Sequence, residues 1–196
     1  GKLEGAGTWN QQYCDPQNTA CSGDKHVYAP LGMLWFGEPG PRDMVERHGR
    51  AQSPVAMNGR IFMQGEEVIM AVDAFNGTLL WRKEIAGAVR VKVKDDGGNL
   101  ALTEKGLFVA AHDKCYRLDP ATGEIIRVYT VPPSDDGVLR RWGYVSVVGD
   151  ILYGSAAEPT EEEYGFIVKT FLRNGKWRDI NEIPEKERER YLEYKT

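Results

Sequence analysis

Short apolar bursts separated by turn residues run along most of the chain. The bursts are rich in β-branched and aromatic residues, which is typical of strands rather than of helices. The first set falls at 53–57, 60–64, 68–73 and 79–85, and the second at 99–104, 107–111, 114–119 and 125–131. Each set predicts a four-stranded antiparallel meander.

Three two-residue junctions lie between apolar bursts: Asn58-Gly59, Lys105-Gly106 and Gly149-Asp150. Asn-Gly favours the positive φ angles of a tight hairpin, and the other two junctions offer a glycine for the same purpose. The sequence therefore predicts a hairpin turn at each of them.

The two sets of strands are copies of one repeat. Asp73 aligns with Asp119 and Gly77 with Gly123, both at an offset of 46, and a partial third copy begins at 149–156. A period in the mid-forties indicates sheets that stack around an axis, as in a β-propeller, whereas a β-sandwich does not ordinarily repeat its turns at a fixed interval. We expect an all-β propeller of about four blades in an incomplete ring. The repeats are expected near 27–37, 51–85, 98–131 and 141–177.

The two ends of the chain depart from this pattern. Residues 181–196 are highly charged and predict a short helix that starts at Pro184, a residue favoured in the first turn. We therefore expect one propeller domain over 1–180, followed by the helix.

The stretch AVDAFNGTLLW, residues 71–81, assigns a mechanical role to each of four residues. Ala71 is small enough for close approach, and Asp73 can accept backbone N–H groups of the turn that follows it. Gly77 supplies a left-handed conformation before the fourth strand, and Trp81 offers a large apolar surface for the seam between sheets.

This spacing of Ala, Asp, Asn-Gly and Trp resembles the tryptophan-docking repeat of the PQQ-like β-propellers, a family of quinoprotein dehydrogenases and non-enzymatic scaffolds. The resemblance implies that the tryptophan locks one blade to the next. Trp35 stands in the docking position of an earlier blade, while the second copy has Arg117 and Arg127 where the small residue and the tryptophan should be. That blade is expected to dock more loosely or against a polar neighbour. The opening segment 7–24 also resembles this family, and the resemblance covers roughly 7–156.

Composition excludes several classes of function. A net charge of −4 argues against binding to nucleic acid, and no apolar run reaches the roughly 18 residues that a membrane-spanning helix needs. Hydrolase and phosphate-loop motifs are absent from the sequence. Cys14 and Cys21 lie in a turn-rich stretch and are either bonded as a local disulfide or two separate thiols, and the sequence leaves both open.

A quinoprotein dehydrogenase of this fold would be expected to have adjacent cysteines beside the cofactor, and this chain has none. It also lacks a haem-attachment motif and an alternating set of calcium-binding oxygens. We expect no catalytic centre, no PQQ, no calcium and no other metal.

Propeller topology places the connectors 38–52, 86–98 and 132–141 on one face with the hairpins at 64–67 and 111–114. This mixed-charge face is the predicted site for a polar ligand or protein partner, although solvated loops would have the same composition. Its candidate residues are Arg42, Arg47, His48, Lys92, Asp95, His112, Asp135, Arg140 and Arg141.

The sequence thus favours a binding or scaffold propeller. It is expected to be completed by self-association, a protein partner or missing blades, because an open arc leaves apolar faces uncovered. The alternative is the N-terminal part of a larger quinoprotein-like oxidoreductase, and a carbohydrate-binding module is a weaker third reading. The resemblance and the Cys14–Cys21 pair imply an exported protein, periplasmic or extracellular.

Overall fold

The computed structural model describes residues 2–37, 52–88, 98–132, 140–157, 172–173 and 176–195. The chain divides into two compact units, Gly1–Ala157 and Glu158–Thr196, and each is described by itself. The predicted domain over 1–180 and the predicted fourth repeat over 141–177 remain predictions, because residues 158–171 lie outside the described part.

The first sheet consists of β1 (Val55–Met57), β2 (Arg60–Gln64), β3 (Val68–Asp73) and β4 (Leu79–Glu84), in the order β1-β2-β3-β4. All neighbours are antiparallel, as predicted, and the strand limits agree with the expected ranges within two residues. The β1–β2 turn has positive φ at both Asn58 (53°) and Gly59 (74°). Asn-Gly is therefore the hairpin turn that the sequence predicts.

The second sheet repeats this arrangement with β5 (Leu100–Thr103), β6 (Gly106–Ala111), β7 (Lys114–Leu118) and β8 (Ile125–Thr130). The predicted Lys105-Gly106 turn is wrong by one residue. Thr103 pairs with Gly106, so Glu104 and Lys105 form the turn and Gly106 begins β6. A Cβ at Gly106 would lie 2.8 Å from the side chain of Arg117, so the glycine makes room for that arginine.

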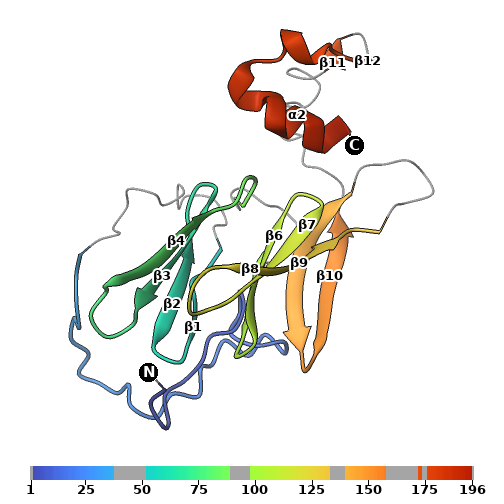
Figure 1. Ribbon diagram of the computed structural model, residues 1–196. Coiled ribbons are helices and arrows are strands. Elements are labelled where there is room, and N and C mark those ends of the chain that lie inside the picture. The colour runs from blue at the N-terminus through green and yellow to red at the C-terminus, as the bar shows by residue number, and fades with distance from the viewer. Residues whose placement is uncertain are drawn as a thin grey trace. The chain divides into compact units, whose positions relative to one another are not determined.

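A third, two-stranded sheet follows, formed by β9 (Arg141–Val148) and β10 (Ile151–Ala157). Gly149 has a φ of 59° in the turn with Asp150, which confirms the predicted hairpin. Figure 1 shows the three sheets next to one another.

Two apolar cores hold unit 1 together. One fills the space between the first two sheets and includes Phe62, Trp81, Leu100, Leu107 and Val109, all buried. The other lies between the second sheet and β9–β10, built around Phe108, Cys115 and Val145. These cores establish the stacking of antiparallel sheets that the 46-residue repeat predicts, and the ring of sheets is not closed.

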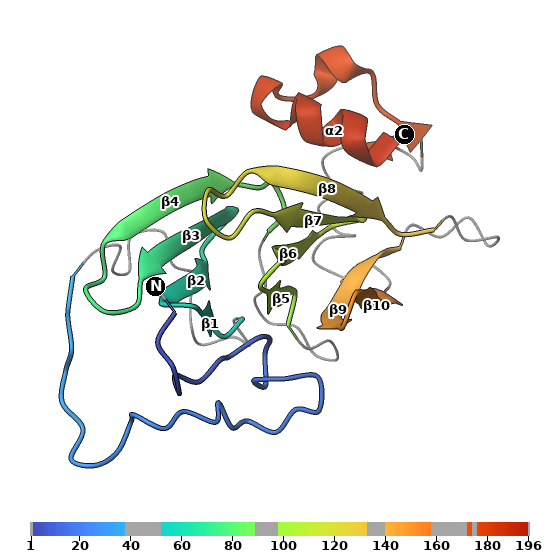
Figure 2. The same ribbon diagram turned by 60° about the horizontal axis from the view of Figure 1, so that its bottom comes forward.

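The N-terminal segment runs beside the inner strands of the sheets (Figure 2). Trp9 exchanges two backbone hydrogen bonds with Ala56 of β1, and Leu102 of β5 donates to the carbonyl of Asn10. Gln11, which is 1% exposed, bonds through its side chain to Tyr144 and Ser146 of β9. One segment therefore connects all three sheets.

Unit 2 contains β11 (Leu172–Arg173), β12 (Lys176–Trp177), two 3₁₀ turns, η1 (Ile180–Glu182) and η2 (Glu185–Glu187), and α2 (Arg188–Lys195). The predicted helix is thus a 3₁₀ turn that starts after Pro184 and continues into α2. Ile183 and Tyr191 are buried, and the Tyr191 hydroxyl donates to the carbonyl of Arg178. In the part of the chain that the structure describes, no helix is long and apolar enough to cross a membrane.

Candidate functional site

The seam between the first and second sheets is built on Trp81. Its indole Nε1 donates to the carbonyl of Pro120 at 3.1 Å, and its ring lies 5.8 Å from that of Phe62. The ring covers Gly123, whose φ is 75° and where a Cβ would lie 2.7 Å from the indole. The turn of the second sheet therefore needs a glycine both for its backbone angle and for the tryptophan that rests on it.

Trp35 makes the same kind of contact with the first sheet. Its Nε1 donates to the carbonyl of Ala74 at 2.9 Å, and its ring covers Gly77, whose φ is 74°. The turn itself is held by Asp73, whose carboxylate accepts from the backbone N–H groups of Phe75 and Asn76. Asp119 accepts from Ala121 in the same way, so both aspartates have the geometry that the sequence predicts for them.

Trp35 lies in an exposed apolar stretch, 27–36, that pairs with no described strand. Its other large apolar residues are between 70% and 90% exposed. They are Val27, Tyr28, Leu31, Met33, Leu34 and Phe36. The stretch is fastened to the first sheet by Trp35 and otherwise presents apolar side chains to solvent.

The seam between the second sheet and β9–β10 is different, because arginines occupy the equivalent positions. In the first sheet Phe62, Ala71 and Trp81 lie opposite one another across β2, β3 and β4. In the second sheet the same row is Phe108, Arg117 and Arg127. Arg117 is half-buried and Arg127 is exposed, whereas Trp81 is 9% exposed.

A groove of about 520 Å³ opens at this seam. Its walls combine aromatic rings from β6, β8 and β9 with charged side chains from β7, β8 and two turns. The residues that carry this character are Phe108, Tyr129 and Trp142, and Lys105, Arg117, Arg127 and Asp150. The groove therefore offers apolar surface and three cations against one carboxylate among its described lining residues.

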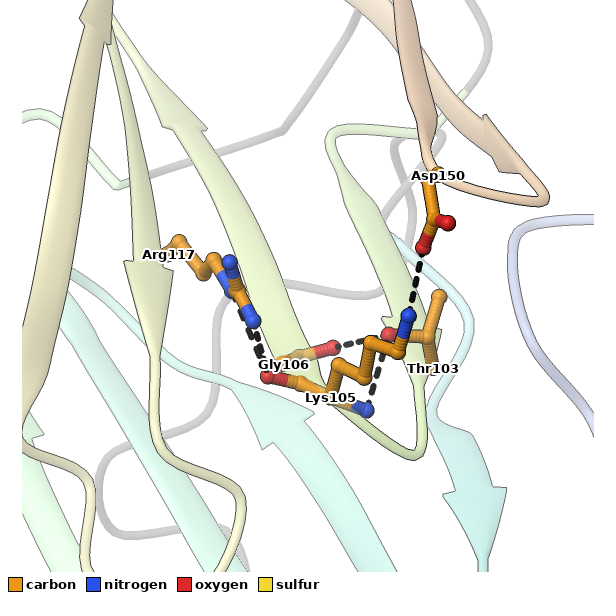
Figure 3. A network of polar contacts seen from close by, with 5 residues as sticks. All are labelled: Thr103, Lys105, Gly106, Arg117 and Asp150. Carbon is orange, nitrogen blue, oxygen red and sulfur yellow. Dashed lines mark hydrogen bonds and ion pairs between the residues drawn. The ribbon is translucent and has the colours of Figure 1, made fainter.

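Figure 3 shows the polar network at one end of the groove. Lys105 Nζ contacts Asp150 Oδ1 at 2.6 Å, and Arg117 donates through Nε and Nη2 to the Lys105 carbonyl at 3.2 and 2.8 Å. The hydrogen bond from Lys105 lowers the pKa of Asp150, with smaller contributions from the charges of Lys105 and Arg117. Asp150 is therefore ionised at neutral pH and already paired with Lys105.

Arg127 is the least engaged cation of the groove. Its guanidinium lies over the Tyr129 ring at 5.1 Å from the centre, and it makes no ion pair with the described part of the chain. Arg117 lies over the Phe108 ring at 5.9 Å. Sequence reasoning found the two arginines through the repeat offset, but it missed the aromatic walls, since which side chains face a neighbouring sheet depends on strand register.

The structure has Cys14 and Cys21 as free thiols, so their disulfide remains a prediction. The Cys14 thiol lies 3.1 Å from the carbonyl oxygen of Cys21, and burial, followed by the charge of Asp15, raises its pKa. Burial raises the pKa of Cys115 to about 12, which makes it an unreactive core residue.

Most of the predicted loop face lies outside the described residues: Arg42, Arg47, His48, Lys92, Asp95 and Asp135. His112, Arg140 and Arg141 are described. The carbonyl of His112 accepts from the backbone N–H of Trp142, and a Cβ at Gly87 would collide with the His112 ring, so these connectors do lie close together. The binding role of this face remains a prediction.

Among the described residues, no group of three or more His, Cys, Asp or Glu side chains could hold a metal ion. The expectation that PQQ and calcium are not bound remains a prediction.

No protein-family model matches this chain, and no curated protein does. Solved structures match part of it. BamB from Moraxella catarrhalis is 18% identical, with a TM-score of 0.42, over 54% of this chain and 35% of that chain. A quinohemoprotein alcohol dehydrogenase from Comamonas testosteroni is 19% identical, with a TM-score of 0.42, over 54% of this chain and 17% of that chain.

A europium-containing methanol dehydrogenase is 12% identical, with a TM-score of 0.47, over 78% of this chain and 28% of that chain. These neighbours include the quinoprotein dehydrogenases that the sequence resembles, at low identity. The chain spans between 17% and 35% of the length of the three proteins.

Proposed function

We propose that this chain is a binding or scaffold segment of a β-propeller, without a catalytic centre of its own. In this proposal, the apolar stretch 27–36 takes up further strands from a second copy, a protein partner or more of a longer polypeptide. The main support is Trp35, which contacts the turn at Ala74 and Gly77 as Trp81 contacts the turn at Pro120 and Gly123, while the stretch around it pairs with none of the described strands.

The repeat predicts how a further strand would pair with the stretch 27–36. Trp81 lies in the outer strand of its sheet and pairs with Ala71 of the neighbouring strand. Residues 27–37 form no strand in the structure, and we propose that Trp35 adopts the same register in an outer strand once a partner strand with a small residue opposite it is present. An exposed apolar strand with free backbone N–H and C=O groups is a template for such pairing.

The mixed-charge loop face is proposed as a second contact surface for a polar ligand or protein. An exported location, periplasmic or extracellular, is part of the proposal and rests on the sequence resemblance and the Cys14–Cys21 pair.

Light scattering tests the exposed stretch. We expect the isolated chain to have an apparent mass above the 22.0 kDa of the monomer. Phe36 is 90% exposed, and Phe36→Glu is expected to lower the apparent mass toward that of the monomer. A buried contact rejects an unpaired charge, which is the physical reason for the shift. Tyr13→Glu, an exposed aromatic outside the stretch, should leave the mass unchanged. A wild-type chain that is monomeric at all concentrations would argue against the proposal.

The enzymatic alternative has its own test. The purified chain, reconstituted with PQQ and calcium, is expected to show no dye-linked oxidation of alcohols or sugars above a blank without protein. Turnover that depends on both additions would contradict the absence of a catalytic centre and favour the quinoprotein-like reading.

A further inference from the structure

The groove between the second sheet and β9–β10 has a charge pattern that the fold does not explain. Arg117 and Arg127 lie directly opposite each other on adjacent strands. Like charges in this position destabilise a sheet, whereas the equivalent pair in the first sheet, Ala71 and Trp81, fills the seam with apolar atoms. An anion between or beside the two guanidinium groups would remove this repulsion.

The described lining of the groove offers few carboxylates that could act as this anion. Asp150 is the one acidic side chain among the described lining residues, and Lys105 already holds it at 2.6 Å. With Lys105, Arg117 and Arg127, the described lining residues have a net positive charge in a chain whose net charge is −4. Charge complementarity therefore favours a ligand with more than one carboxylate.

The walls add an apolar requirement. Phe108 and Tyr129 support the two arginines from below, with cation-to-ring distances of 5.9 and 5.1 Å. Trp142 also lines the groove, and its Nε1 is buried without a hydrogen-bond partner. The ring of Trp142 therefore adds apolar surface to the groove, while its buried N–H group is not accessible to a ligand.

The shape of the site favours an extended ligand. The lining comes from both sheets and from the turns between their strands, and β8, which contributes Arg127 and Tyr129, is an edge strand of its sheet. Successive side chains of an extended peptide point to opposite sides, so its acidic residues can face Arg117 and Arg127 on the second sheet while its apolar residues face Trp142 on β9.

We propose that this groove binds an extended acidic peptide segment of a partner protein, in which carboxylates alternate with apolar residues. Arg127 and Arg117 pair with the carboxylates, and Trp142 on β9 contacts the apolar side chains. This site is distinct from the stretch 27–36, so the failure of either proposal leaves the other standing.

The test uses calorimetric titration of the full chain at low salt with acetyl-Glu-Phe-Glu-Leu-Glu-Phe-amide. Its matched control replaces each glutamate of the peptide by glutamine. We expect the acidic peptide to bind at least tenfold more tightly and to shift the Trp142 indole N–H resonance in ¹⁵N NMR spectra, assigned with Trp142→Phe. Equal affinity for the two peptides, or no binding of either, would overturn the proposal.

Variants locate the binding. Arg127→Gln removes an exposed positive charge and should lower the affinity for the acidic peptide at least tenfold. Arg82→Gln removes one positive charge from β4, outside the groove, and should change the affinity less than twofold. Equal effects of the two would mean non-specific charge attraction and would overturn the site. Isophthalate serves as a free dicarboxylate, and tighter binding of isophthalate than of the peptide would overturn the assignment to a peptide.

Discussion

Trp81→Ala is expected to lower the free energy of unfolding by about 3–5 kcal/mol, the range for removing a large buried aromatic side chain. The variant loses the contact with Phe62, the hydrogen bond to Pro120 and the cover over Gly123. Because these contacts join two sheets, the variant loses packing between the sheets as well as packing within the first sheet. Urea denaturation followed by near- and far-ultraviolet circular dichroism measures the change.

The repeat itself provides the control. Arg127 occupies the position equivalent to Trp81 but is exposed, so Arg127→Ala should change stability by no more than about 0.5 kcal/mol. Equal losses for the two variants would show that the position, and not the tryptophan seam, determines stability.

Gln11→Leu is expected to lower the free energy of unfolding by about 2–4 kcal/mol, because buried partners are left without hydrogen bonds. The Gln11 amide donates to Asp15 O at 2.8 Å and to the Tyr144 hydroxyl, and it accepts from Ser146 Oγ at 2.8 Å. Leucine has a similar volume but cannot form hydrogen bonds with any of these groups. Thermal and urea denaturation give the size of the loss.

Gln12→Leu is the matched control for this variant. The side-chain oxygen of Gln12 accepts one hydrogen bond, from the backbone N–H of Ser53 at 2.9 Å. Gln12→Leu is therefore expected to lower the free energy of unfolding by about 1 kcal/mol. If Gln12→Leu were as destabilising as Gln11→Leu, the link to β9 would not be the source of the effect.

The eight strands of the first two sheets could be predicted because their determinants are local. Short apolar bursts rich in β-branched and aromatic residues, and the turn residues between them, are visible in any window of ten residues. The Lys105-Gly106 turn was misplaced for the same reason: a glycine next to a polar residue resembles a hairpin turn. The actual reason for Gly106 is the space that Arg117 needs on the neighbouring strand, and that contact is not local.

The seams and the groove could be predicted only in part. The offset of 46 marks Arg117 and Arg127 as departures from the repeat, which predicts a different contact at the third sheet. The i, i+2 spacing of Arg127 and Tyr129 places both on one face of β8, but nothing in the sequence shows that Trp142 meets them, since this depends on the packing of β9 against the second sheet. The role of Gln11 was equally hidden, because one buried glutamine in an irregular segment has no periodic signal.

The N-terminal segment also has a consequence for the order of folding. Each four-stranded sheet can form as its own residues leave the ribosome, since every pairing within it is between neighbouring hairpin strands. Gln11, however, finds its partners 133 and 135 residues later in the chain, at Tyr144 and Ser146. Trp9 can pair with Ala56 much earlier, so we expect the N-terminal segment to dock in stages and the Gln11 side chain to reach its final partners last, after the longest loop of unit 1 has closed.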